Sequence, residues 1–179
     1  MRIAAFYFAL FAAVGVLLPY MPIFYRFLGF NGSQMAVLAS IGPLLAILVP
    51  PTWGFASDRA QRASAFLKIA AFGSAAAFVG LYFARSFASV ALVLAAYAVF
   101  SSPLTPLADS LAAVEAERLG TDYARIRLFG SIGFILVSFA FGAFLSRGAD
   151  GTDVILVGSA LLFIAAVVSL LLKSEKASC

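Results

Sequence analysis

The chain has 179 residues, of which 64% are hydrophobic and 11% are charged, and its mean hydropathy is +1.06. Soluble domains have about 45–50% apolar and about 25% charged residues, so the composition excludes a soluble globular domain and predicts an integral membrane protein. The 12 Lys and Arg against 8 Asp and Glu give a formal net charge of +4. These basic residues are spread singly between apolar runs, which indicates membrane topology and not a nucleic-acid-binding surface.

Two residue types that carry chemistry are nearly missing. The sequence has no histidine, and Cys179 is the only cysteine. It therefore excludes an intrachain disulfide, a Cys/His metal site and a His or Cys nucleophile. We expect no enzyme and no bound cofactor.

Six apolar runs are long enough to cross the hydrocarbon core of a bilayer, which takes about 20 residues of helix. The runs lack the alternation that marks barrel strands. The predicted fold is therefore an all-α membrane protein, a single six-helix transmembrane bundle over residues 1–179. The predicted helices are Ile3–Tyr25, Gln34–Ala56, Ala63–Ala84, Phe87–Ala112, Ile126–Leu145 and Val154–Leu172.

The positions of Lys and Arg predict the orientation, because cytoplasmic connections are enriched in these residues. With the N-terminus inside, nine basic residues lie on the inner side and three on the outer side. We expect a protein of the bacterial inner membrane with both termini in the cytoplasm. The inner set is Arg2, Arg59, Arg62, Lys68, Arg118, Arg125, Arg127, Lys173 and Lys176, and the outer set is Arg26, Arg85 and Arg147.

A weak internal repeat relates the first three predicted helices to the last three. Pro19 and Pro22 in the first helix correspond to Pro103 and Pro106 in the fourth. Ser-Ile-Gly recurs at 40–42 and 131–133, and Gly-Ser-Ala at 73–75 and 158–160, although such tripeptides also recur by chance. Three helices per copy is an odd number, so the copies are predicted to be inverted. Proline-interrupted helices at corresponding positions point to a transporter's binding site, and we predict helix breaks at the four prolines.

The stretch Ser101–Gly133 contains charged residues within or beside its apolar runs, where charges are least expected. Asp109 lies near the end of one apolar run, and Arg125 and Arg127 open the next. A charge that enters lipid costs ~2.5–3.5 kcal/mol on insertion scales and usually marks a pathway or a site. Counted at 1.5 Å per residue from the outer ends of their helices, Asp109 and Arg127 fall at similar depth near the inner membrane edge. The residues alone leave open a substrate site and a structural ion pair.

The sequence after the second predicted helix resembles a known loop. Gly54, Asp58, Arg59 and Arg62 match Gly-x-x-x-Asp-Arg-x-Gly-Arg-Arg, found between helices 2 and 3 of the major facilitator superfamily. The glycine would allow close helix contact, and the Asp and Arg would pair or cap neighbouring helix ends. This sequence departs from the pattern at Gln61, where the family usually has glycine, and at Ala63, where it usually has a basic residue.

A second resemblance is more specific. Residues 122–134 are similar to the start of helix 5 in the group that contains lactose permease and the nucleoside and phenylpropionate proton symporters. The resemblance implies the N-terminal six-helix half of a major facilitator fold. It further implies that Asp109 and Arg127 hold substrate hydroxyls and that Phe134 stacks on the substrate ring. Asp in place of Glu and Phe in place of Trp leave the substrate open among a sugar, a nucleoside and an aromatic acid.

The resemblance favours a secondary active transporter that moves a small polar solute by alternating access, with the proton as a possible coupling ion. Superfamily transporters have two six-helix halves. Besides the bilayer and the solute, we therefore expect a second copy of the chain or a missing C-terminal half as partner. The chain is then a half-transporter that acts as a homodimer, or a fragment. The alternative is a non-transporting fragment or assembly module whose Asp109–Arg127 pair is structural.

Overall fold

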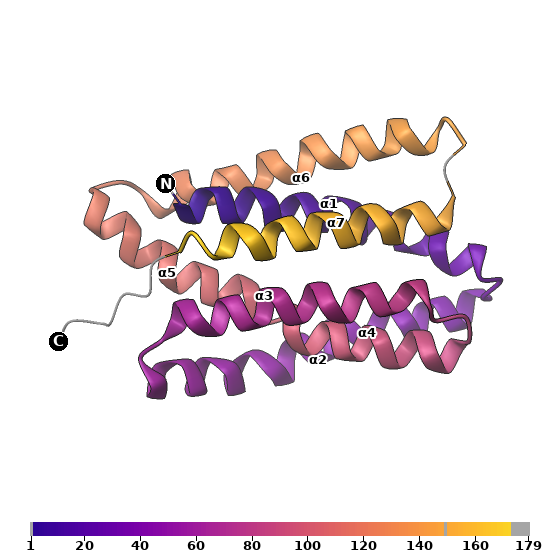
Figure 1. Cartoon of the computed structure of the whole chain (residues 1–179), viewed down its shortest axis with the longest axis horizontal. Coiled ribbons are helices and arrows are strands. Elements are labelled where there is room, and N and C mark those ends of the chain that lie inside the picture. Colours follow the sequence, from indigo (N-terminus) through magenta and orange to yellow (C-terminus); the bar gives the residue numbers. More distant parts are fainter. Residues whose placement is uncertain (1, 149, 173–179) are drawn as a thin grey trace.

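The structure, a computed structural model, describes residues 2–148 and 150–172, and within these residues the regular elements are all helices (Figure 1). The helices long and apolar enough to cross a membrane make six spans within the described residues. The predicted all-α fold with six spans is confirmed. The elements are α1 (Arg2–Phe27), α2 (Gly32–Ala60), α3 (Ala63–Val79), the 3-10 turn η1 (Gly80–Tyr82), α4 (Phe87–Ser101), α5 (Leu104–Leu119), α6 (Tyr123–Leu145) and α7 (Gly151–Ser169).

Several helices extend beyond the apolar runs that predicted them. We expected the second helix to end at Ala56 and the fourth at Ala112, but α2 continues to Ala60 and α5 to Leu119. The polar residues after each run do not end the helix, since the helix ends where the backbone turns left-handed. That happens at Gln61, with φ 53°, and at Gly120, with φ 61°.

The prediction of helix breaks at four prolines is correct at Pro103 and wrong at the other three, since Pro106 lies within the first turn of α5. Pro19 and Pro22 lie inside the continuous helix α1, whereas the fourth span is interrupted between Ser101 and Leu104, at Pro103. Each proline removes one backbone hydrogen-bond donor, and both proline pairs have the same spacing. The prolines alone therefore do not determine whether the helix is interrupted. Packing differs: 61% of the apolar window of α1 is buried, against 28% for the span that contains the interruption. Neighbouring helices hold α1 in helical form.

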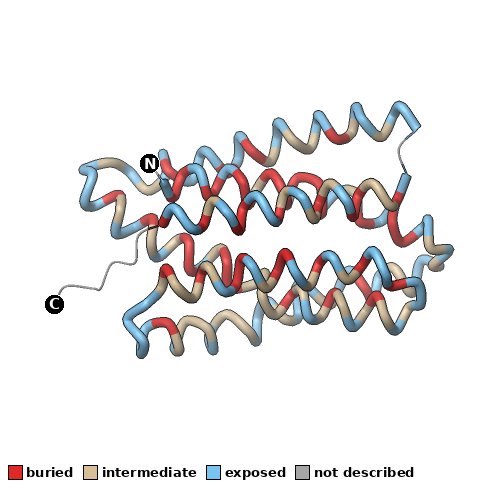
Figure 2. Tube along the Cα trace, viewed as in Figure 1, coloured by how far each residue is buried: buried red, intermediate tan, exposed pale blue. Residues whose placement is uncertain are grey.

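Helix α1 is the most buried span of the described chain. It packs against α6 on one side and α7 on the other, while the α4–α5 span packs against α2 and α3. The two halves of the chain have equivalent contacts. When each of the first three spans is exchanged with its counterpart among the last three, the contacts of α1 with α6 and α7 become those of the α4–α5 span with α2 and α3. The α3–α7 contact then corresponds to itself. This is the pairing expected of two inverted three-helix repeats. Buried residues gather on α1 and on the helix faces turned toward it (Figure 2).

Two glycines bring α1 and α6 into backbone contact. A Cβ added at Gly15 of α1 would stand 2.7 Å from the carbonyl oxygen of Phe134. A Cβ added at Gly133 of α6 would collide with the backbone of Phe8. Only glycine allows helices to approach this closely. The contact fixes the relative position of the two helices that carry most of the site.

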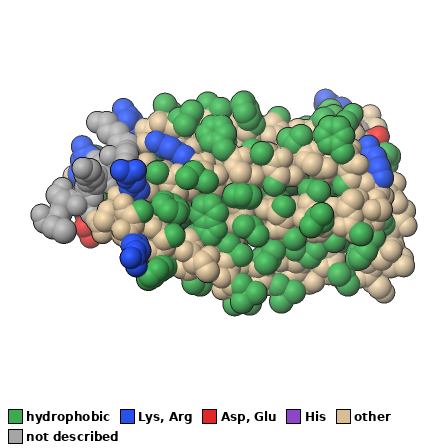
Figure 3. All heavy atoms as spheres, turned by 60° about the horizontal axis from the view of Figure 1, so that its bottom comes forward, with side chains coloured by type: hydrophobic (Ala, Val, Ile, Leu, Met, Phe, Trp, Pro, Cys, Tyr) green, Lys and Arg blue, Asp and Glu red, His purple; other side chains and the backbone are tan. Residues whose placement is uncertain are grey.

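The charged residues lie at the two ends of the bundle, and apolar side chains cover the middle of the face seen in Figure 3. We call the end where α1, α3 and α6 begin the basic end. The described members of the predicted inner set lie there, and the predicted outer set lies at the opposite end. Lys173 and Lys176 lie outside the described residues. The members at the basic end are Arg2, Arg59, Arg62, Lys68, Arg118, Arg125 and Arg127.

Candidate functional site

The structure brings Asp109 of α5 and Arg127 of α6 together at the basic end. Asp109 Oδ2 lies 3.9 Å from Arg127 Nη1, and the two side chains are 32% and 51% exposed, respectively. A charged hydrogen bond between such groups is about 2.7–2.9 Å long. The pair is therefore an open ion pair, near enough to attract and too far apart to close on itself. The two residues face each other, as the sequence analysis expected.

Two tyrosines that were not predicted from the sequence complete the cluster. The hydroxyl of Tyr7 in α1 donates a hydrogen bond to Asp109 Oδ1. The hydroxyl of Tyr123 in α6 donates to the same oxygen at 2.8 Å and accepts from Arg127 Nη1 at 3.0 Å. One signal was available for Tyr123, because it lies four residues before Arg127 and so on the same helix face. Tyr7 gave no such signal within its apolar run.

These hydrogen bonds leave a defined set of groups for a ligand. Oδ1 of Asp109 accepts from two phenols, whereas Oδ2 makes no hydrogen bond within the described residues. Arg127 uses Nη1 toward Tyr123, and its planar guanidinium has further N–H donors in a fixed fork. A solute hydroxyl can therefore donate to Oδ2 while another of its oxygens accepts from Arg127. The arrangement offers one free carboxylate acceptor and several guanidinium donors side by side.

Phe134, the third residue expected at the site, lies farther along α6. It is seven residues beyond Arg127, which is about 10 Å along a helix, and its backbone packs on Gly15. The ring is half-buried. The structure thus places Phe134 on the same helix as Arg127, about two turns away.

Arg125 has surroundings unlike those of Arg127. Its Nε lies 4.0 Å from Asp122 Oδ2, and the two side chains are 79% and 83% exposed. Ion pairs between side chains as exposed as these contribute little to stability. Arg125 thus serves as a natural comparison for Arg127.

The predicted loop motif is only partly a loop. Gly54, Asp58 and Arg59 belong to the last turns of α2, and Arg62 directly precedes α3. Nothing lies within 4 Å of a Cβ added at Gly54, so the expected close helix contact at this glycine does not form within the described chain. The side chains of Asp58 and Arg59 likewise make no ion pair with a described residue.

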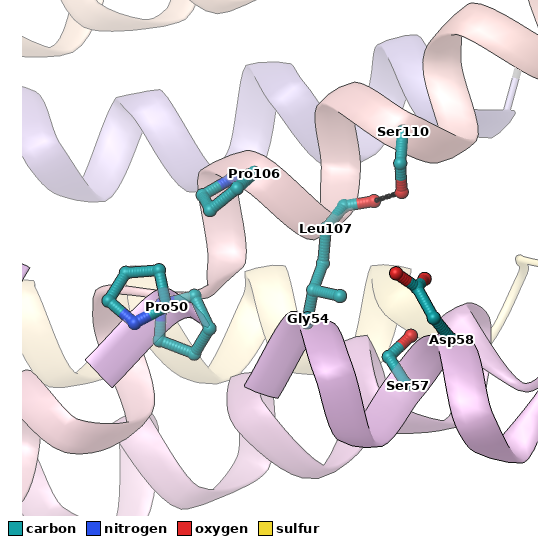
Figure 4. Close-up of a pocket in the computed structure, with 8 residues that line it drawn as sticks. Pro50, Gly54, Ser57, Asp58, Pro106, Leu107 and Ser110 are labelled. Carbon is teal, nitrogen blue, oxygen red and sulfur yellow. Dashed lines mark hydrogen bonds between the residues drawn. The ribbon is translucent and has the colours of Figure 1, made fainter. Parts of the chain in front are cut away.

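Gly54 instead borders a small cavity between α2 and α5 (Figure 4). Its volume is about 160 Å³, which is room for water. The buried hydroxyl of Ser57 lies at its wall without a hydrogen-bond partner among the described residues. Asp109 is adjacent in sequence to the lining residue Ser110 but points toward α1 and α6, so the cavity is separate from the ion pair. The lining residues are Pro50, Gly54, Ser57, Asp58, Pro103, Pro106, Leu107 and Ser110.

Comparison with known proteins places the chain among transporters. Residues 1–178 match the MFS_1 like family. The chain is 33% identical over 141 residues to the uncharacterized transporter YwbF of Bacillus subtilis (78% of this chain, 35% of the relative). It is 32% identical over 143 residues to a maltose permease of Geobacillus stearothermophilus (76% and 35%). It is 28% identical over 136 residues to a probable 3-phenylpropionic acid transporter of Escherichia coli (74% and 35%).

Solved structures agree on the fold. The crystal structure of the nucleoside transporter NupG superposes with a TM-score of 0.87 at 20% identity, over 98% of this chain and 44% of NupG. A mutant of NupG gives a TM-score of 0.88 over 97% of this chain. The chain spans about a third of the length of the curated relatives and less than half of NupG.

Proposed function

The chain belongs to the MFS_1 like family and corresponds to the N-terminal six-helix half of a major facilitator fold, and from this premise we propose that it binds a small polar solute and moves it across a membrane by alternating access. The observation that carries the proposal is the open pair of Asp109 and Arg127. Partly exposed charges of opposite sign inside a helical bundle of this kind are expected to mark a solute pathway.

The site favours a neutral, hydroxyl-bearing solute. Arg127 is already near one carboxylate and bonds to Tyr123, so a carboxylate ligand would have to compete with Asp109 for the same guanidinium. A hydroxyl-bearing ligand can use both residues together. Among sugars, nucleosides and aromatic acids, we therefore favour the first two. The names of the relatives, which include a maltose permease and a probable 3-phenylpropionic acid transporter, define the probes for a test.

Proton coupling is part of the proposal through the resemblance to proton symporters. Asp109 is the described acid with a place at the solute site, so it is the candidate proton carrier of this chain. If solute movement is proton-coupled, a pH gradient drives uptake into vesicles. Uptake that does not respond to the pH gradient would contradict proton coupling.

The membrane setting follows from the basic end. The proposal places the chain in a bacterial inner membrane with the basic end in the cytoplasm, because Lys and Arg gather at that end and cytoplasmic connections favour them. The solute site then opens near the cytoplasmic face. Labelling of single cysteines introduced at Arg59 and Arg85, from outside intact cells, tests this orientation.

A partner completes the pathway in this proposal. One half lines one side of a central cavity, and a second copy or a C-terminal half lines the other. Helices α2 and α6 are the least buried spans of the chain, which leaves surface for such a partner. If the second copy is correct, two Asp109–Arg127 pairs surround one cavity.

Flux measurement tests the proposed function. The purified chain is reconstituted into lipid vesicles, and counterflow of labelled maltose, uridine and 3-phenylpropionate is followed, with cross-linking to measure the oligomeric state. We expect flux of at least one probe by a cross-linkable dimer, lost in Asp109→Asn. Monomers alone together with no flux would contradict the homodimer.

A structural role for the pair is the second candidate. It is favoured by one observation, since the two tyrosines already hydrogen-bond Asp109 within the chain. In that case Arg127→Lys and Asp109→Asn lower the stability of the bundle without changing the affinity for any solute.

A further inference from the structure

Asp109 is held from two helices through a single oxygen. We propose that Tyr7 and Tyr123 are positioning residues that fix Oδ1 of Asp109, so that Oδ2 and the guanidinium of Arg127 are presented to the solute. This inference rests on the proposed function, because it concerns the same solute site. It adds two residues and assigns different roles to the two oxygens of one carboxylate.

Tyr7 supplies the rigid anchor. Its side chain is fully buried, with an exposed fraction of 0%, and its ring stacks on Phe11 at a centroid distance of 6.1 Å. A buried hydroxyl needs a hydrogen-bond partner, and the partner of Tyr7 in the structure is Asp109 Oδ1. Because α1 is the most buried span, this hydroxyl cannot follow Asp109 if the carboxylate turns. Tyr7 therefore sets where Oδ1 lies.

Tyr123 links the carboxylate to the guanidinium. It donates to Asp109 Oδ1 and accepts from Arg127 Nη1, so one hydroxyl orients both charged groups. The Arg127 guanidinium carbon also lies 6.0 Å from the centre of the Tyr123 ring, near the outer limit for attraction between a cation and a ring face. Tyr123 is the first residue of α6, one turn before Arg127.

The two tyrosines keep the ion pair open. With Oδ1 bound to both hydroxyls, Oδ2 remains 3.9 Å from Arg127 Nη1, whereas an unrestrained pair closes to about 2.7–2.9 Å. Removal of either hydroxyl frees the carboxylate to turn toward Arg127 and close the pair. A solute then has to break an ion pair before it binds. Both substitutions should therefore weaken solute binding while the three helices of the site, α1, α5 and α6, stay in place.

The chain offers a matched control in Tyr20. Like Tyr7, it lies on α1 and its hydroxyl makes a hydrogen bond to another helix, in this case to the Ser138 carbonyl oxygen at 2.9 Å. It is remote from Asp109, since it lies 13 residues, or about 20 Å of helix, from Tyr7. Tyr20→Phe removes a hydroxyl from the same helix without touching the solute site.

Binding and spectroscopy together test the inference on the full chain in lipid nanodiscs. The affinities for maltose, uridine and 3-phenylpropionate are measured for the wild type, Tyr7→Phe, Tyr123→Phe and Tyr20→Phe. We expect about tenfold weaker binding for Tyr7→Phe and Tyr123→Phe, as for the loss of one hydrogen bond to a charged group, and less than about threefold for Tyr20→Phe. On an Asp109→Asn background, Tyr7→Phe should have little further effect. Equal affinities of Tyr7→Phe and wild type would overturn the inference.

A readout without solute separates the inference from the proposed function. Infrared spectra of protein carrying carboxyl-¹³C aspartate, with Asp109→Asn as the reference, isolate the carboxylate stretch of Asp109. This band should shift in Tyr7→Phe and in Tyr123→Phe and stay unchanged in Tyr20→Phe. If no probe binds the wild type but the band shifts, the proposed solutes are wrong and the positioning role holds. A band that stays in place in both site variants contradicts the positioning role.

Discussion

Gly15 of α1 meets the backbone of Phe134 in α6 so closely that a Cβ at position 15 would stand 2.7 Å from the Phe134 carbonyl oxygen. Gly133 makes the reciprocal contact with the backbone of Phe8. Since backbone atoms on both sides are fixed by helical hydrogen bonds, neither helix can yield locally. These contacts hold α1 and α6 at the separation across which Tyr7 and Tyr123 reach the same carboxylate.

Substitution of either glycine should separate the helices. We expect Gly133→Ala and Gly15→Ala to lower stability by ~1–3 kcal/mol, the usual range for overpacking, and to weaken solute binding as well. Thermal unfolding in detergent measures the first effect. Gly42→Ala in α2 is the control, because nothing lies within 4 Å of a Cβ at that position. Equal unfolding temperatures for Gly133→Ala and Gly42→Ala would contradict the backbone contact.

Gln61 carries strain that a glycine would relieve. Its φ of 53° is left-handed, a conformation that costs a side-chain-bearing residue roughly 1–2 kcal/mol. Gln61→Gly should therefore raise the unfolding temperature, even though it removes the exposed hydrogen bond from Gln61 to the Asp58 carbonyl oxygen. Gly120, with φ 61° and open space around it, gives the opposite test. A Gly120→Ala variant as stable as the wild type would show that these helix ends adjust freely.

Alanine substitution at two aspartates that precede helices should lower the stability of the protein by different amounts. Asp150 caps α7, since its carboxylate accepts from the Thr152 backbone N–H at 2.7 Å, whereas Asp122 precedes α6 without a side-chain cap. We expect Asp150→Ala to lower stability by ~1 kcal/mol and Asp122→Ala by less than ~0.5 kcal/mol. Chemical denaturation of both variants in the same detergent makes the comparison. Equal losses would be inconsistent with the cap.

The hydroxyl of Ser57 is buried without a partner among the described residues. Its replacement should cost nothing, because an unpaired buried hydroxyl loses its hydration without gaining a hydrogen bond. Ser57→Ala is thus expected to be as stable as the wild type or more so. Ser74→Ala is the comparison, since Ser74 is equally buried but donates to the Ala71 carbonyl oxygen. A larger loss in Ser57→Ala would reveal a water that bridges Ser57 across the cavity.

The spans could be predicted because their signal is local. A run of about 20 apolar residues has one stable state in lipid, so the sequence sufficed for six spans. Helix ends were harder, as α2 and α5 show: they continue through polar residues until a left-handed residue stops them. The proline prediction failed at Pro19 and Pro22 because the outcome depends on what packs against α1, which lies far away in sequence.

The charged residues of the candidate site could be predicted from the sequence, whereas its tyrosines could not. The residues alone singled out Asp109, Arg125 and Arg127, because a charge in an apolar run is costly and therefore conspicuous. The resemblance to the lactose-permease group then favoured Arg127 over Arg125. Tyr7 was missed because a tyrosine in such a run is an ordinary packing residue until its partner is known. That partner is 102 residues away in the sequence, and only the folded bundle brings the two together.

Equilibrium binding to the purified chain measures what Asp109 and Arg127 contribute to holding a solute. The affinities for maltose, uridine and 3-phenylpropionate are compared between wild type, Asp109→Asn, Arg127→Lys and Arg125→Lys, with unfolding temperatures as the check on folding. We predict that at least one hydroxyl-bearing probe binds the wild type and Arg125→Lys equally, and binds Asp109→Asn and Arg127→Lys at least about tenfold more weakly. Equal binding to all four proteins would contradict this prediction.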